Sequence, residues 1–527
     1  MTRKIISLLL ALCLLLPADA LAEAAPAAYP IVDQPIIIQG VCFGDNQGTD
    51  THRILWDEIE KLTNIRVEWT FVSYEQRGVY LAMGDWPDLF HNSFDSNTIE
   101  EYGVQAGMLV NLLDYIELMP NLQKTYADYP GARKMALSSN GGIYQFPRIN
   151  SATTAANCRW QYRYDKLEAL GLSVLKTVDE YYRALAALKN ASGEAPICDN
   201  LAPRHGFQGT AGGEWFHCAA FGASNNPNFE DNGVGTVVYN RMSEQYRRYL
   251  QFMNKLYAEG LLHQEYLTMD NTTRLSCIES GATVFGMDAW GNVSKAEVFQ
   301  NGFTDLRQLA PLTSEYDDTQ TVAGYPVVSA IGCVISARSP YVKEICRMMD
   351  IFYAQDEVSP GTGLYGVAGT YGPENITWYF SNDDKTEWDY ILPEGYSETG
   401  TTYQWTNVII GNNFGRFDGF MSSAFNGAMS NGRARQMSYV QGLIPYQEAE
   451  QFPAGKMAFT EEEQNVIFMY ETEIRSHVDE WTAWFIAGTK DPGSDADWQE
   501  YVSAFESMHL SEVIQAYQTA YARYLAL

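Results

Sequence analysis

The first hundred residues alternate short apolar runs with one amphipathic segment. Residues 35–41 form a short apolar run with several β-branched side chains, and residues 65–71 alternate apolar with polar positions, so both are predicted to be strands. Between them, residues 55–62 carry leucine and isoleucine at helical spacing, and a turn with a third strand follows at 84–90. Strands that alternate with helices predict a mostly parallel sheet.

Three later helices are predicted from their start signals and apolar stripes. Two of them open with a capping box, one between Thr177 and Glu180 and the other between Thr460 and Glu463. The third begins at the Ser-Pro pair 339–340. The residues expected on the buried sides of these helices are Tyr181, Leu185 and Leu188; Val466, Tyr470, Ile474 and Val478; and Val342, Ile345, Met349 and Phe352.

Three further strands and one loop-rich region complete the pattern. Residues 141–147, 282–287 and 331–336 are predicted to be strands from their apolar and β-branched content. Residues 361–455 are rich in Gly, Asn, Tyr and Trp and have little periodicity. This region is therefore interpreted as long loops.

The N-terminus has the pattern of a secretory signal peptide. A basic start, an apolar run and small residues occupy positions 1–22, so we expect cleavage after Ala22, with Ala20 as the alternative. No other run is apolar enough to span a bilayer. Cys13 is the only cysteine that could carry a lipid, and it lies inside the apolar run, which argues against an anchor. The sequence predicts an extracytoplasmic protein, secreted, at the cell surface or in a periplasm.

Composition and charge narrow the class of protein. Apolar residues make up 46% of the chain and aromatic residues 13%, which is enough for two hydrophobic cores. The formal net charge is −30, and such a field repels nucleic acids and anionic lipid surfaces. We therefore predict no nucleic-acid partner.

The cysteines and acidic residues give no sign of a metal site. Seven cysteines remain after processing, an odd number with no C-x-x-C, so neither a disulfide framework nor a zinc site is expected. Most of them are predicted to be buried thiols, and one disulfide of unspecified pairing stays possible. Asp491, Asp495, Asp497 and Glu500 form an acidic cluster that we interpret as helix N-terminal capping. We predict no metal and no cofactor.

The order of these segments resembles one protein family. Gly-Asp-Trp-Pro-Asp-Leu-Phe at 84–90, the segment 107–116, the strand, crossover and capped helix of 141–189, the strand and turn of 282–291 and the strand 331–336 resemble the sugar-type (family 1) extracellular solute-binding proteins of ABC importers, in a long-chain branch. The resemblance implies an α/β, two-lobed periplasmic-binding-protein-like fold of type II with a hinge between the lobes.

The resemblance also implies how the chain divides. After the signal peptide 1–22, lobe 1 would comprise residues 23–150 and 328–358, and lobe 2 would comprise 151–327 and 359–527. Many family members carry a calcium loop after the capped helix. Residues 189–197 lack the acidic ligands that such a site needs, so no calcium is expected there.

The implied ligand would lie between the lobes and contact aromatic and polar side chains. Sugar rings stack on flat aromatics, and their hydroxyl groups exchange hydrogen bonds with fixed polar groups. The candidates follow the family's cleft segments: the turn after the third strand, the crossover, a Gly-rich loop, the strand end near 287 and the long loops. They are Asn92, Phe94 and Asp95; Arg159 and Trp160; Glu214 and Trp215; Asp288 and Trp290; and Tyr365, Trp378, Trp405 and Arg416.

Enzyme motifs are scarce, and the resemblance implies a binding protein without catalytic residues. The sequence has no G-x-S-x-G, H-E-x-x-H or P-loop, and the G-x-G-x-x-G at 361–366 follows Pro360 and no predicted strand. The resemblance implies that a monomer captures an oligosaccharide and delivers it to ABC permease subunits. Two alternatives stay open: the same fold with a peptide or another small polar solute, and a secreted glycan-degrading enzyme.

Overall fold

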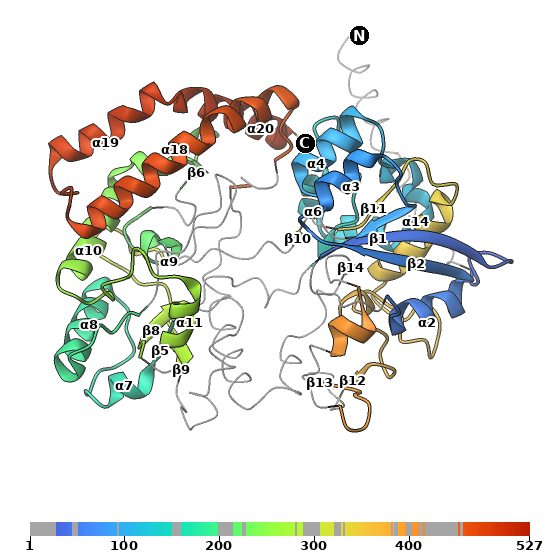
Figure 1. Ribbon diagram of the computed structural model, residues 1–527, viewed down its shortest axis with the longest axis horizontal. Helices are drawn as coiled ribbons and strands as arrows, with labels where there is room; N and C mark the ends of the chain where they lie inside the picture. The colour runs from blue at the N-terminus through green and yellow to red at the C-terminus, as the bar shows by residue number, and fades with distance from the viewer. Residues whose placement is uncertain are drawn as a thin grey trace, which may run out of the picture.

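A computed structural model describes most of the chain after its first 27 residues. The described residues are 28–44, 51–91, 94–149, 160–198, 214–223, 228–279, 282–287, 306–320, 328–329, 332–380, 383, 388–396, 403–410, 415–416, 452–453 and 457–526. The predicted signal peptide and its cleavage site lie outside these residues. In Figure 1 the elements form two bodies side by side, with blue and yellow-orange segments in one and green and red segments in the other.

The first body, lobe 1, is built on a four-stranded sheet in the order β11-β3-β1-β2. Its strands are β1 (Ile36–Phe43), β2 (Ile65–Val72), β3 (Leu89–His91) and β11 (Val334–Ile335). β1, β2 and β3 are parallel, as predicted, and β11 is antiparallel to β3. β11 thus confirms the predicted return of the chain to the first sheet.

Short helices surround this sheet. They are α2 (Ile54–Thr63), α3 (Arg77–Met83), α4 (Ser96–Ile99), the π-helix η1 (Glu100–Gln105), the 3-10 helix η2 (Leu112–Leu118), α5 (Pro120–Asp128), α6 (Pro130–Ala136), α14 (Val342–Asp350) and the 3-10 helix η5 (Ile351–Tyr353). The stripe of α14 is confirmed, because Ile345, Met349 and Phe352 are buried and Val342 is half-buried. Ser339 lies before the helix and accepts a hydrogen bond from the Tyr341 N–H.

The second body, lobe 2, has a small sheet covered by long helices. Its strands are β5 (Trp160–Arg163), β8 (Phe285–Met287) and β9 (Leu306–Gln308), in the order β8-β5-β9, and the hairpin β6 (Phe229–Asp231) and β7 (Val237–Tyr239). Its helices are α7 (Tyr164–Glu168), α8 (Val178–Ser192), α9 (Glu214–Ala219), the 3-10 helix η4 (Asn240–Met242), α10 (Glu244–Ala258), α11 (Asn271–Glu279), α18 (Glu461–Ala487), α19 (Asp495–Ser507) and α20 (Leu510–Ala526). The last three lie along the top of this body in Figure 1.

A three-stranded sheet marks where the chain leaves lobe 1. It contains β4 (Arg148–Ile149), β10 (Val328–Ser329) and β14 (Gly415–Arg416) in the order β10-β4-β14. β14 is parallel to β4 and β10 is antiparallel to it. The last residue of β4, the first residue of β10 and the last residue of β14 therefore lie side by side at the same end of the sheet. The described residues beyond these points belong to lobe 2. The chain therefore passes between the lobes three times, after β4, before β10 and after β14, always at this end of the sheet. We call this sheet the crossing sheet.

The described residues of the segment 359–416 pack with lobe 1 and not with lobe 2, while the other predicted lobe boundaries stay predictions. Residues 359–416 were assigned to lobe 2, but Leu364, Ala368 and the segment 408–410 lie in the apolar core under β1 and α2. The third pass comes after Arg416. The reason is packing: the buried Arg53 at the start of α2 donates from Nε to the Ile409 carbonyl at 2.9 Å, which fixes this segment to lobe 1.

Two predictions of local structure need correction. Residues 141–147 form no strand, since Gly141 has a φ of 80° and Pro147 has no N–H to donate to a ladder. The region 361–455 contains short elements in its described part. These are α15 (Ala368–Tyr371), the hairpin β12 (Trp378–Phe380) and β13 (Trp388–Tyr390), the π-helix η6 (Gln404–Val408) and β14.

One disulfide joins two segments of lobe 2. Cys198 and Cys277 are bonded, a pairing that the sequence left open. The other described cysteines, Cys42, Cys218, Cys333 and Cys346, are buried thiols, as predicted. Among the described helices, none is both long and apolar enough to cross a bilayer.

Both predicted capping boxes are present. Thr177 Oγ1 accepts from the Glu180 N–H at 3.1 Å while the Glu180 carboxylate accepts from the Thr177 N–H, and Thr460 with Glu463 does the same at the start of α18. Thr177→Ala should lower the free energy of unfolding by about 1 kcal/mol, because the first turn of α8 loses its acceptor. Denaturant unfolding followed by circular dichroism measures this. Thr177→Ser, which keeps the hydroxyl, is the matched control, and equal stability of the two variants would contradict the prediction.

Candidate ligand-binding site

The best-placed surface for a ligand is where the parallel strands end and the crossing sheet begins. In open α/β sheets, ligands bind beyond the carboxyl ends of the strands. Val334 pairs with Phe90, so Cys333 lies beside His91 at the carboxyl end of β3. The Cys333 carbonyl accepts from the Phe146 N–H at 2.9 Å. The chain then enters β4, the central strand of the crossing sheet.

The base of this region is an apolar wall. His91 is buried, and desolvation lowers its pKa to about 4, against the opposing effect of a hydrogen bond with the Ile410 backbone. Its ring packs edge-on to Trp69 at 6.2 Å. His91 is thus a neutral packing residue at physiological pH.

Phe94 and Asp95, which follow β3, have local structural partners. The Phe94 side chain has no exposed surface and packs against Trp86 and Phe90, with ring centroids 6.3 and 5.3 Å away. Asp95 caps α4 by accepting from the Thr98 N–H at 2.8 Å. Their proposed ligand contacts stay predictions, and any contact by Phe94 requires this aromatic cluster to rearrange.

Trp160 begins β5, on the lobe 2 side of the first pass. Its side chain is buried, and its indole N–H donates to the Tyr181 hydroxyl at 3.3 Å. The His217 ring stands edge-on to it at 4.8 Å, and His217 Nε2 is 3.4 Å from the same hydroxyl. These contacts fix Trp160 in the core of lobe 2, where it anchors the start of β5.

The four candidates in the loop-rich region all lie in lobe 1. Tyr365 is half-buried and donates to Glu374 at 2.9 Å, and burial, followed by the nearby Glu374 charge, raises its pKa. Trp378 has no exposed surface and donates from Nε1 to the Gly372 carbonyl. Trp405 is half-exposed in η6. Of the four, Trp405 and Tyr365 are the aromatics with partly exposed surface that could stack on a sugar.

Arg416 is held within lobe 1. It is buried, its Nη1 donates to Asp128 at 2.7 Å, and its guanidinium lies over the Tyr129 ring at 5.2 Å. The same ion pair keeps the pKa of Asp128 below its usual value. Because Arg416 ends β14, this pair fixes the start of the third pass, and its ligand contact stays a prediction.

The remaining candidates cannot be placed with their side chains. Glu214 and Trp215 begin the helix α9, so the predicted loop is a helix at this point. Four candidates lie outside the described residues, namely Asn92, Arg159, Asp288 and Trp290. β8 ends at Met287, which pairs with Trp160, so the chain leaves β8 where it enters β5. The described residues next to these two candidate segments, Trp160 and Met287, are thus paired.

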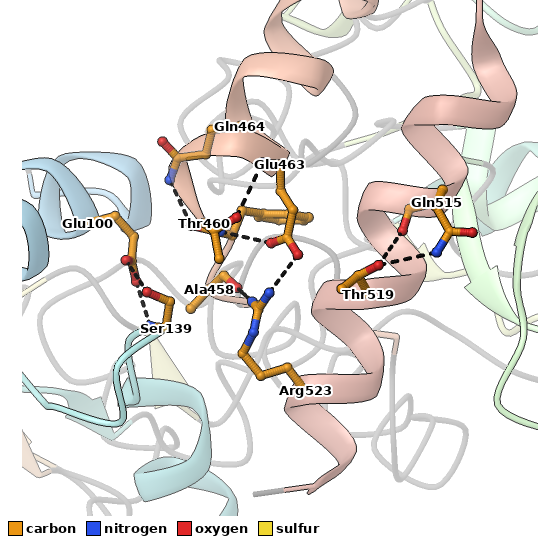
Figure 2. A network of polar contacts seen from close by, with 10 residues as sticks. Glu100, Ser139, Ala458, Thr460, Glu463, Gln464, Gln515, Thr519 and Arg523 are labelled. Atoms are coloured by element: carbon orange, nitrogen blue, oxygen red, sulfur yellow. Dashed lines mark hydrogen bonds and ion pairs between the residues drawn. The ribbon is translucent and has the colours of Figure 1, made fainter.

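Polar residues of the two lobes also face each other near the start of α18. Figure 2 shows Glu100 and Ser139 of lobe 1 facing the start of α18 and the end of α20. Arg523 donates to Glu463 at 2.6 Å and to the Ala458 carbonyl. Glu100 accepts from the Ser139 N–H and hydroxyl, and its burial raises its pKa while Ser139 and Arg523 oppose the rise.

The C-terminal helix also contacts lobe 1 directly. Lys134 Nζ on α6 lies 4.3 Å from the ring centroid of Tyr524 on α20, a cation–π contact. The end of α20 is therefore held against lobe 1.

The described residues contain no group of three or more His, Cys, Asp or Glu side chains that could hold a metal ion. The acidic cluster lies at the start of α19, as predicted, but the capping residue is Ser494. Asp497 accepts hydrogen bonds from the Asp491 N–H and from Lys490. At 189–197, α8 ends at Ser192 and the Lys189 ammonium donates to the Glu259 carbonyl. The absence of calcium there stays a prediction.

Comparison with known proteins gives the resemblance a firm basis. No protein-family model matches the chain. The fructooligosaccharide ABC transporter substrate-binding protein FusA of Streptococcus pneumoniae is 23% identical over 500 residues, which cover 90% of this chain and 87% of FusA. A human-milk-oligosaccharide-binding solute-binding protein of Bifidobacterium longum infantis superposes with a TM-score of 0.75 at 16% identity, covering 94% of this chain and 99% of that one. The chain has the fold of the solute-binding proteins of ABC importers.

A third relative agrees with this assignment. The alginate-binding protein AlgQ2 superposes with a TM-score of 0.66 at 20% identity, covering 93% of this chain and 99% of AlgQ2. The two-lobed, periplasmic-binding-protein-like fold and the resemblance to sugar-type solute-binding proteins are thus confirmed. These relatives are named as binding proteins, and none of the three is named as an enzyme.

Proposed function

We propose that this protein is the substrate-binding component of an ABC importer and captures an oligosaccharide between its two lobes. The observation that carries the proposal is the crossing sheet. Three chain segments pass to lobe 2 from the same end of this sheet. Connections that leave from one end of a single sheet let two bodies rotate relative to each other about that end. Closing them would bury a solute at the carboxyl ends of β1, β2 and β3.

The class of ligand rests on the relatives and on the residues. FusA is named for fructooligosaccharides, and the other two relatives are named for milk oligosaccharides and alginate. In this chain the half-exposed Trp405 and the predicted Trp290 would supply aromatic faces, and Asp288 would accept from hydroxyl groups. These relatives are named for different glycans, so we assign the class of oligosaccharides and no single sugar.

Permease subunits of an ABC importer are the proposed partners, and the working form is a monomer outside the cytoplasm. Ligand closure would bring the two lobe surfaces into one fixed arrangement that a permease pair can recognise. The signal-peptide pattern at 1–22 supports export.

Ligand binding should raise the melting temperature of the full mature chain. Thermal shift against fructooligosaccharides, lacto-N-tetraose, alginate oligosaccharides and a peptide pool tests this, followed by calorimetry on each positive. A ligand at 100 times its Kd should stabilise the folded state by about 2.7 kcal/mol.

The two rivals predict different results. A peptide that shifts melting while every glycan fails would reassign the ligand class. Chromatography of each glycan after overnight incubation checks the enzyme reading, because a receptor returns its ligand intact. Cleavage of the stabilising glycan would overturn the proposal.

A further inference from the structure

Gln145 stands out because its buried side-chain oxygen has no hydrogen-bond donor among the described residues. It has 5% of its surface exposed, and no hydrogen-bond donor of the described chain reaches its buried Oε1. We propose that Gln145 is a ligand-recognition residue whose carboxamide oxygen accepts a hydrogen bond from a sugar hydroxyl. This inference rests on the proposed function and adds a residue that none of the sequence patterns identified.

The position of Gln145 in the fold supports this role. The next residue, Phe146, donates from its N–H to the Cys333 carbonyl at 2.9 Å, at the carboxyl end of β3. Three residues further on, the chain is in β4 and then leaves for lobe 2. Gln145 therefore lies between the end of the parallel sheet and the crossing sheet, where a solute held by both lobes would be in reach.

Several polar groups close to Gln145 have hydrogen-bond partners. Asn140 Nδ2 donates to the Tyr144 hydroxyl at 2.8 Å, and Asn140 Oδ1 accepts from the Gly142 N–H at 2.9 Å. Two residues beyond Gln145, the Pro147 carbonyl accepts from the Tyr353 hydroxyl at 2.6 Å. The oxygen of Gln145 thus lacks a donor although the neighbouring side chains of Asn140 and Tyr144 are hydrogen-bonded.

Energetics make this exception informative. A buried acceptor left without a donor costs about 1–3 kcal/mol, so a structural role alone would favour an apolar side chain of similar size. A ligand hydroxyl would donate to this oxygen in the bound state. Binding would then remove the free-energy cost of the unsatisfied acceptor, which favours the complex. A site that hydrogen-bonds a substrate hydroxyl also discriminates strongly against ligands that lack it.

The test compares Gln145→Leu with the wild-type mature chain. Leucine has a similar volume and no acceptor, so the ligand-free variant should melt at the wild-type temperature or above it. The Kd for each probe that the wild type binds, from kestose, lacto-N-tetraose and an alginate oligosaccharide, should rise at least about 10-fold by calorimetry. Gln105→Leu, at an exposed position of η1, is the matched control and should change neither quantity.

Each outcome decides the matter. A Gln145→Leu variant with unchanged Kd overturns the inference and leaves the proposed function intact. A fall in melting temperature of more than about 3 °C also overturns it, because the oxygen would then have a structural partner in the free protein. If the wild type binds none of the probes, the proposed function falls and this inference falls with it.

Discussion

Gly366→Ala should destabilise lobe 1 by more than about 3 kcal/mol, the upper range for forcing extra atoms into a packed site. A Cβ at this position would lie 1.9 Å from the Arg416 carbonyl oxygen and 3.1 Å from the Ala354 carbonyl oxygen. Both are backbone atoms, so no side chain can turn away to make room. Gly366 also donates from its N–H to the Ala354 carbonyl at 2.9 Å.

The effect should reach beyond stability, because Arg416 ends β14, the strand that leads into the third pass. Denaturant unfolding of the full chain measures the loss, and glycan affinity should fall as β14 is displaced. Gly131→Ala is the control, since a Cβ there meets nothing within 4 Å and α6 gains a better helix former. Wild-type stability of Gly366→Ala would mean that β14 does not pack on residue 366.

Asp350 should make the protein less stable as the pH rises from about 4 to about 7. Its carboxyl group is buried at the start of α5, where it accepts from the N–H groups of Asn121 and Leu122 at 3.2 and 2.8 Å. Burial raises its pKa to about 7, although these hydrogen bonds favour the charged form.

The sign follows from proton uptake. Between the unfolded pKa of about 4 and the folded pKa of about 7, the native state binds more protons than the unfolded state, so raising the pH favours unfolding. The full contribution is on the order of 4 kcal/mol, complete once the pH exceeds the folded pKa.

Asp350→Asn isolates this contribution, because the carboxamide keeps an acceptor oxygen and cannot ionise. The difference in unfolding free energy between variant and wild type, measured by denaturant titration at pH 4.5, 5.5, 6.5 and 7.5, should move in favour of the variant as the pH rises. Asp318→Asn, at an exposed position of lobe 2, is the control and should give a flat difference. A flat difference for Asp350→Asn would mean that its carboxyl is already charged in the folded state at pH 4.5.

The sequence predicted those elements whose signals are local. The two capping boxes and the β-α-β start were recoverable because a cap needs residues three positions apart, and a sheet strand shows its alternation within one segment. The family resemblance supplied the two-lobed fold, which no local pattern contains.

The third pass was misplaced because its cause is not local. Residues 359–416 have little periodicity, and their membership of lobe 1 depends on distant partners such as Arg53 for Ile409 and Asp128 for Arg416. No spacing rule reveals such pairs.

Site residues were the least predictable part for a related reason. The local sequence around an aromatic residue in a loop does not distinguish a partly exposed side chain, such as Trp405, from a buried one, such as Trp378. Gln145 left no signal at all, since what distinguishes it is the lack of a donor nearby.

The three passes have a consequence for biosynthesis. β14 is translated only after most of the polypeptide, yet it pairs with β4 in the first lobe, while α18, α19 and α20 complete the second lobe at the very end. Neither lobe can complete its hydrophobic core before the ribosome has translated the last segments of the chain. A nascent chain would thus emerge with two unfinished interiors, a state suited to export before folding and exposed to premature aggregation when secretion stalls.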